Sequence, residues 1–123
     1  MEPVMKKTKG SDVEINLAEW EGPGKTILCI HGLTANCRCW DVVATPLASE
    51  YHILAMDLRG RGHSGMPETG YSIDDHCLDI KCVMEDLSLK KVILVGHSLG
   101  AFITLAFSAR YPELVEKIVL VDG

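Results

Sequence analysis

The chain has 123 residues, of which 47% are hydrophobic and 24% charged, a balance typical of a soluble globular protein. Its net charge of −5 argues against nucleic-acid binding through a basic surface. No apolar run approaches the ~20 residues of a membrane-spanning helix, and residues 1–7 lack the apolar core of a signal peptide. We therefore expect a cytoplasmic protein with no membrane span and no nucleic-acid partner.

The five cysteines form no C-x-x-C pair, so neither a disulfide framework nor a zinc site is indicated. Cys29 lies in an apolar run and is interpreted as a small core residue, while Cys37 and Cys39 are interpreted as unrelated free thiols. Because no cluster of His, Cys and Asp has the spacing of metal ligands, we expect no metal and no organic cofactor.

The first half of the chain predicts strands and one short helix. The lysine cluster at 6–9 is interpreted as a solvated N-terminal segment. Residues 13–17 alternate between apolar and polar, which indicates a half-exposed strand. Residues 26–30 are continuously apolar, as in a strand covered on both faces. Helical spacing of apolar residues predicts a short helix over 40–50, and 52–56 is a second buried strand.

The second half predicts two longer helices between strands. Ser72 and Asp75 suit a capping box at the start of an amphipathic helix that extends to Leu87. A buried strand over 92–95 precedes a helix that begins near Ala101 and ends at Arg110. That helix is apolar on all sides, so we expect it to be deeply packed, and 118–121 is one more buried strand.

Strands that alternate with helices at this spacing predict an α/β fold, a mostly parallel sheet with helices on both faces. The loops that begin at His31, Asp57, Gly96 and Asp122 all follow strands. They should therefore gather at one edge of the sheet, where the functional residues of such folds lie.

Residues Gly96 to Gly100 match G-x-S-x-G, between an apolar strand and a helix. A serine on such a turn is a nucleophile elbow, with a strained backbone that requires small neighbours two positions away. The helix N-terminus brings unpaired N–H groups close to the hydroxyl. The alternative is a glycine-bounded turn whose Ser98 merely caps the helix.

Three motifs in order resemble the α/β-hydrolase family of serine esterases, lipases and haloperoxidases. They are His31-Gly32-Leu33, residues 57–64 and the elbow, and the resemblance extends from about residue 12 to the end. It implies the N-terminal portion of that fold, through about the sixth strand. It also implies a serine hydrolase for carboxylic esters or related small acyl substrates.

By position in the family, Ser98 would be the nucleophile. The backbone N–H groups of Leu33 and Leu99 would form the oxyanion hole. Serine at the elbow argues against the family's haloalkane dehalogenases and epoxide hydrolases, which carry aspartate there.

Five further residues would support the elbow and the oxyanion loop. His31 would orient that loop by hydrogen bonds, and Gly32 follows it. Gly96 and Gly100 would leave room for the elbow. His97 would point away from the path of attack on the substrate and pack.

The remaining histidines and the loop after residue 56 suggest structural roles. We interpret His63 and His76 as exposed and His52 as a strand-edge residue. Asp57 and Arg59 are expected to fix their loop rather than touch substrate.

In this family the order is serine, acid, then histidine, and no histidine follows His97. Asp122 follows a strand where some members carry the acid, but an Asp before glycine is more often a structural loop residue. Residues 1–123 would therefore be a partial domain, truncated before the acid, the histidine and any lid. We expect it to be marginally stable and inactive alone, with the C-terminal half supplied by further sequence or another chain. The alternative is a non-catalytic module that binds a ligand or partner.

Overall fold

A computed structural model describes residues 2–121, in which six strands form one sheet. The strands are β1 (Val4–Lys9), β2 (Glu14–Trp20), β3 (Thr26–Ile30), β4 (His52–Met56), β5 (Val92–His97) and β6 (Val115–Val121). Their spatial order is β1-β2-β4-β3-β5-β6. β4, β3, β5 and β6 run parallel to one another. β2 pairs antiparallel with both of its neighbours, β1 and β4. The predicted α/β fold with a mostly parallel sheet is confirmed.

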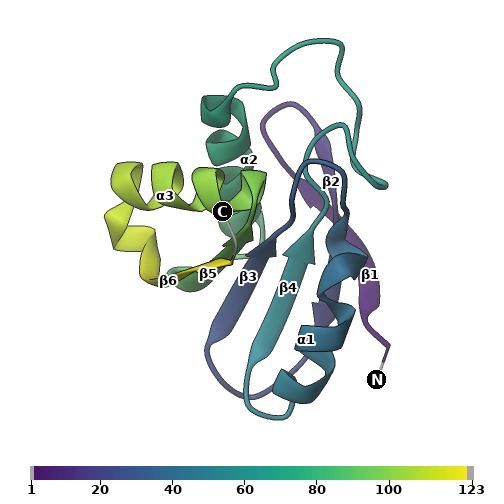
Figure 1. Ribbon diagram of the computed structural model, residues 1–123, viewed down its shortest axis with the longest axis vertical. Coiled ribbons are helices and arrows are strands. Elements are labelled where there is room, and N and C mark those ends of the chain that lie inside the picture. Colours follow the sequence, from purple (N-terminus) through teal and green to yellow (C-terminus); the bar gives the residue numbers. More distant parts are fainter. Residues whose placement is uncertain (1, 122–123) are drawn as a thin grey trace.

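Helices cover both faces of the sheet, as predicted (Figure 1). They are α1 (Asp41–Leu47), α2 (Ile73–Asp86) and α3 (Leu99–Arg110), with short 3-10 helices at Cys37–Trp40 and Pro112–Leu114. Alternate residues of each strand point to opposite faces. Leu28 and Ile30 of β3 therefore enter the core beneath α2 and α3, while Ile27 and Cys29 pack on the α1 side.

The capping box at the start of α2 is present as predicted. Ser72 Oγ accepts the Asp75 N–H at 3.1 Å, and an Asp75 carboxylate oxygen accepts the Ser72 N–H at 3.0 Å. We expect Ser72→Ala to lower the free energy of unfolding by about 1 kcal/mol, because it removes the cap. Chemical denaturation measures this loss, and Ser108→Ala is a control that should change little, because this half-buried hydroxyl only donates to the Leu105 carbonyl oxygen of its own helix. Equal stability of S72A and the wild type would contradict a stabilising cap.

Residues 6–9, interpreted as a solvated segment, are largely exposed as expected, with Lys7 and Lys9 in solvent and only Thr8 buried, but they belong to strand β1. The strand pairs with β2 over its whole length, from Val4 opposite Glu19 to Lys9 opposite Glu14. Lys6 Nζ lies 3.1 Å from a Glu19 carboxylate oxygen. Such lysines keep their charge in solvent on an edge strand and discourage further strand pairing.

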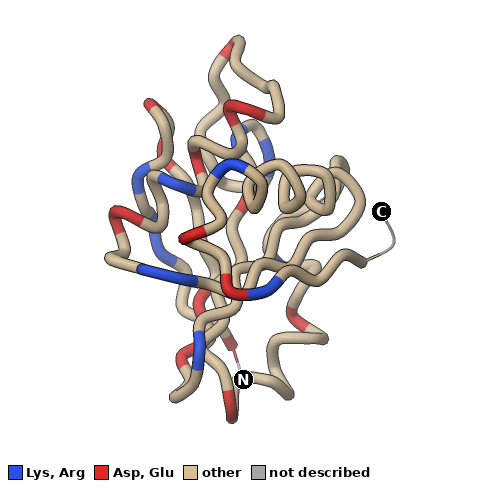
Figure 2. The backbone as a smooth tube through the Cα atoms, turned by 90° about the vertical axis from the view of Figure 1, so that its left-hand side faces the viewer, with Lys and Arg blue, Asp and Glu red and all other residues tan. Residues whose placement is uncertain are grey.

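The expectation of deep packing holds for only one face of α3, where Ile103 and Phe107 are buried, and the expectation that the last strand is buried is wrong. The side chains of Phe102 and Leu105 on α3 are 62% and 46% exposed, and β6 is exposed along residues 116–121. The sequence of α3 has no charged residue before Arg110, and Figure 2 shows the surrounding part of the backbone tube mostly tan. β6 is the edge strand of the described sheet, so its apolar side chains are exposed although their pattern predicts burial.

Candidate active site

Ser98 stands alone between the end of β5 and the start of α3. Its φ of +56° and ψ of −118° lie in a region that non-glycine residues rarely occupy. Such a conformation costs of order 1–3 kcal/mol and persists only where the surroundings enforce it. The strained strand–turn–helix expected from the sequence is therefore present.

Close backbone packing explains the glycines on either side of Ser98. A Cβ atom at position 96 would lie 2.2 Å from the Gly100 carbonyl oxygen. A Cβ atom at position 100 would lie 2.1 Å from the Ile30 carbonyl oxygen. Both distances are far inside van der Waals contact, so the elbow and the end of β3 can approach this closely only with glycine.

The Ser98 hydroxyl does not cap α3. Within residues 2–121 it makes no capping hydrogen bond, although the residue occupies the N-cap position. Only the backbone takes part, as the Ser98 carbonyl oxygen accepts the Ala101 N–H at 2.9 Å. The alternative in which this serine is a helix cap is therefore wrong.

The loop after β3 lies against the elbow. A Cβ atom at Gly32 would be 3.2 Å from the Ser98 Cβ and 3.3 Å from His97 Nδ1. The N–H groups of Leu33 and Leu99 donate to no backbone acceptor among the described residues. Two N–H groups near Ser98 in the fold are thus without a backbone acceptor among the described residues, one from this loop and one from the first turn of α3.

His31 is buried and holds this loop through both ring nitrogens. Its Nε2 accepts the Leu58 N–H at 3.0 Å, so Nδ1 carries the proton and donates to the Gly32 carbonyl oxygen at 2.6 Å. Burial lowers the pKa of His31, against the hydrogen bond to Gly32 that raises it. A neutral imidazole with both nitrogens engaged orients the loop and is not available as a base for Ser98.

Asp57 holds the glycine-rich loop after β4 from the inside. Its carboxylate accepts the N–H of Cys37 at 2.7 Å, the N–H of His63 at 2.9 Å and Nδ2 of Asn16 at 2.9 Å. Burial alone would raise the pKa of Asp57, but these donors outweigh it and lower the pKa. The contacts are those of a loop-fixing residue, as expected.

Arg59 links the same loop to α2 and to the turn after β1. Its guanidinium forms a two-point ion pair with Asp79, at 2.7 and 2.9 Å, and both side chains are buried. It also donates to the carbonyl oxygens of Gly70 at 2.7 Å and Ser11 at 2.8 Å. Every strong contact of Arg59 is therefore structural.

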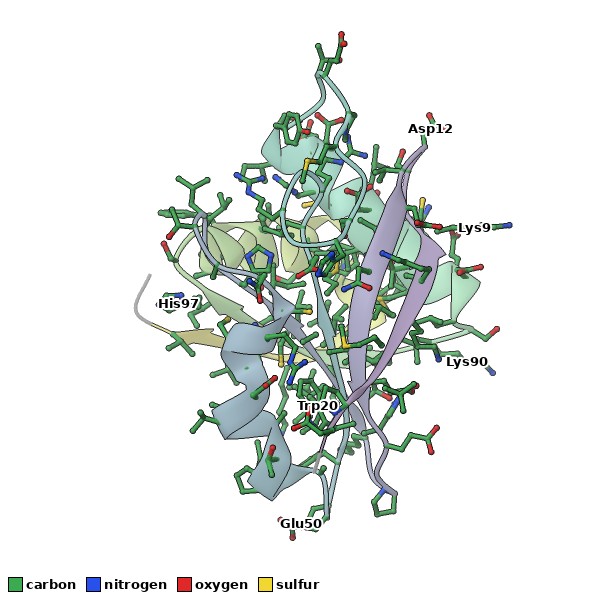
Figure 3. All side chains as sticks on the ribbon, turned by 90° about the vertical axis from the view of Figure 1, so that its right-hand side faces the viewer. Lys9, Asp12, Trp20, Glu50, Lys90 and His97 are labelled. Atoms are coloured by element: carbon green, nitrogen blue, oxygen red, sulfur yellow. The ribbon has the colours of Figure 1, made fainter. Side chains whose placement is uncertain are left out.

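Two histidines differ in their surroundings. His97 is half-buried beside a hollow of about 200 Å³, on the side of the sheet where α1 lies (Figure 3). The expectation that His76 is exposed is wrong, since it is buried on α2 beneath the 57–72 loop. Burial lowers the pKa of His76 to about 4, so the ring is neutral near pH 7. An amphipathic pattern does not distinguish a histidine under a loop from one in solvent.

Arg61 lies near the site, and its position there was not predicted from the sequence. Arg61 Nε donates to the Leu33 carbonyl oxygen at 3.3 Å, so this side chain touches the loop beside Ser98. The available signal was its place in a glycine-rich loop that begins at the same sheet edge as the loop of His31. Asp122, the possible acid, lies outside the described residues.

Comparisons with known proteins agree with this geometry. A family model described as alpha/beta hydrolase fold matches residues 25–123. The chain is 37% identical over 110 residues to 2-(acetamidomethylene)succinate hydrolase of Mesorhizobium japonicum, covering 89% of this chain and 39% of that protein. No helix in residues 2–121 is long and apolar enough to cross a membrane.

Solved structures superpose closely on the whole described sheet. The crystal structure of an epoxide hydrolase from Vigna radiata has a TM-score of 0.94 at 27% identity, over 99% of this chain and 40% of that one. The structure of E-2-(acetamidomethylene)succinate hydrolase has a TM-score of 0.93 at 34% identity, over 98% of this chain and 45% of that one. The chain thus spans less than half the length of the proteins it matches.

Proposed function

Because the chain belongs to the α/β-hydrolase fold family, we propose that it is the N-terminal part of a serine hydrolase for carboxylic esters or related acyl compounds. Ser98 is the nucleophile, and the backbone N–H groups of Leu33 and Leu99 stabilise the oxyanion. The observation that carries the proposal is the strained Ser98, whose hydroxyl is not used as a cap although it stands at a helix N-terminus.

The proposed reaction begins when Ser98 Oγ attacks the substrate carbonyl carbon. A general base takes the hydroxyl proton, and the carbonyl oxygen gains negative charge between the two N–H donors. Collapse expels the alcohol, which receives the proton from the base. Water then hydrolyses the acyl-serine and restores Ser98. Each oxyanion donor contributes about 3 kcal/mol to such a step.

The base and its orienting carboxylate belong to sequence beyond the described residues in this proposal. His31 has both ring nitrogens committed to the oxyanion loop. Asp57 is buried and bound by three donors. Both groups are committed to holding loops and neither contacts Ser98 among the described residues, so these residues supply the nucleophile and the oxyanion hole alone.

Serine at the elbow favours acyl chemistry over epoxide opening. Relatives of this chain include proteins named as hydrolases of an acetamido compound and of epoxides. The epoxide hydrolases of this family carry aspartate at the elbow. Ser98 instead suits attack on a carbonyl carbon, with the oxyanion facing the two backbone donors.

A fluorophosphonate probe tests the proposal in the full-length protein. We expect stoichiometric labelling, mapped by peptide mass to Ser98, because the probe reacts with activated serines only. S98A should take no label, while S108A, altered near the other end of α3, should label as the wild type does. A wild-type protein that stays unlabelled would contradict the proposal and favour a non-catalytic binding module.

A further inference from the structure

The guanidinium of Arg61 lies against the loop after β3 that carries the proposed oxyanion donor Leu33. Its Nε donates to the Leu33 carbonyl oxygen at 3.3 Å and its Nη1 to the Arg59 carbonyl oxygen at 3.2 Å. The Tyr71 ring packs against it, with the ring centroid 6.0 Å away. These contacts hold the side chain in place beside the loop that carries the proposed oxyanion donor.

Three of the five N–H donors of Arg61 have no acceptor among residues 2–121. No carboxylate of the described residues lies within 4.0 Å of this guanidinium. The acidic groups in this region are committed elsewhere: Asp79 to Arg59, and Asp75 to the cap of α2. Among residues 2–121, the positive charge of Arg61 at the C-terminal edge of the sheet therefore has no carboxylate partner.

The field of Arg61 reaches the buried histidines on either side of it. Burial is the main cause that lowers the pKa of His31 and of His76, and the Arg61 charge lowers both further.

The remaining N–H donors of Arg61 suit a ligand with a planar, ionised group, since a guanidinium matches a carboxylate with two parallel hydrogen bonds.

We propose that Arg61 binds a carboxylate of the substrate, so that the enzyme is selective for acyl compounds with a second, ionised carboxyl group. The inference rests on the proposed role of Ser98. Arg61 Nε contacts the carbonyl oxygen of Leu33, the same residue whose N–H is the proposed oxyanion donor. A carboxylate held by Arg61 would therefore belong to the same substrate as the reacting carbonyl, a few bonds away from it.

Binding of succinate, a simple dicarboxylate, tests the proposal without any turnover. We expect calorimetry on full-length S98A to detect succinate, and the further change R61Q to weaken that affinity ~10-fold to ~100-fold. R61K should recover part of the loss, because it keeps the charge and loses the two-point geometry. R110Q is the matched control, since it removes an arginine charge at the far end of α3.

Kinetics separate substrate binding from mere support of the loop. For an ester with a free carboxylate, R61Q should raise KM ~10-fold or more with little change in kcat, and for a neutral ester of equal size the rise in KM should be much smaller. Equal losses on both esters would overturn the proposal and leave Arg61 as a positioning residue for Leu33. Wild-type affinity for succinate in R61Q, or no succinate binding by S98A, would also overturn it. Fluorophosphonate labelling of Ser98 decides the proposed function separately.

Discussion

Replacement of Gly100 by alanine should lower the free energy of unfolding by about 3 kcal/mol and abolish labelling of Ser98. The new Cβ would lie 2.1 Å from the Ile30 carbonyl oxygen and 2.8 Å from that of His31. Both atoms are backbone at the end of β3, so no side-chain rotation relieves the contact. The better helix propensity of alanine, about 1 kcal/mol, is the smaller effect.

The consequence for chemistry follows from the same contact. α3 carries Leu99 and must move away from β3 to admit a methyl group, which separates the two proposed oxyanion donors. Urea denaturation of the full-length protein gives the stability, and the rate of fluorophosphonate labelling reports on the site.

Gly65→Ala is the matched control for this change. A Cβ there would meet the Val13 Cγ2 methyl at 2.7 Å, and its next neighbour would be 3.5 Å away. A valine side chain can rotate, so G65A should cost far less and label normally. If G100A matched G65A in stability and labelling, close packing of the elbow on β3 would not be required.

The sequence predicted the central strands because burial determines their pattern. β3 and β4 occupy the expected residues, since a strand covered on both faces must be continuously apolar. The strand–serine–helix order likewise required glycine at 96 and 100, and the backbone contacts at those positions explain why. A local sequence pattern predicts the structure reliably where the surrounding packing allows only one conformation.

Features that depend on distant parts of the chain were not predictable. β1 has no apolar alternation to reveal it, and its position comes from pairing with β2 and from Thr8 Oγ1, which donates to Asp86 at 2.5 Å. The burial of His76 depends on where the 57–72 loop crosses α2. Arg61 reaches Leu33 only because the loops after β3 and β4 meet at one sheet edge.

Asp79→Ala should lower the free energy of unfolding by about 3–5 kcal/mol. The side chain of Asp79 is fully buried and that of Arg59 is 6% exposed, so the change leaves a buried guanidinium with no counter-charge. Asp79 also accepts the Ser11 N–H at 2.8 Å, which is lost as well. Denaturation of the full-length protein measures the effect.

Asp74→Ala is the control on the same helix. Its ion pair with Arg110 is solvent-exposed, so its loss should cost less than about 1 kcal/mol. The double variant Arg59→Met with Asp79→Leu should be more stable than D79A alone, because it removes the unpaired charge along with its partner. D79A as stable as D74A would contradict a structural role for the pair.

The loss in D79A should extend to the site through Arg59. With its partner gone, Arg59 no longer holds the Gly70 and Ser11 carbonyl oxygens in place, and the 57–72 loop becomes mobile. Arg61 lies in that loop, two residues from Arg59. We therefore expect D79A to weaken succinate binding in the S98A background, while D74A leaves it unchanged. The buried pair thus acts as the support on which the proposed carboxylate selectivity depends.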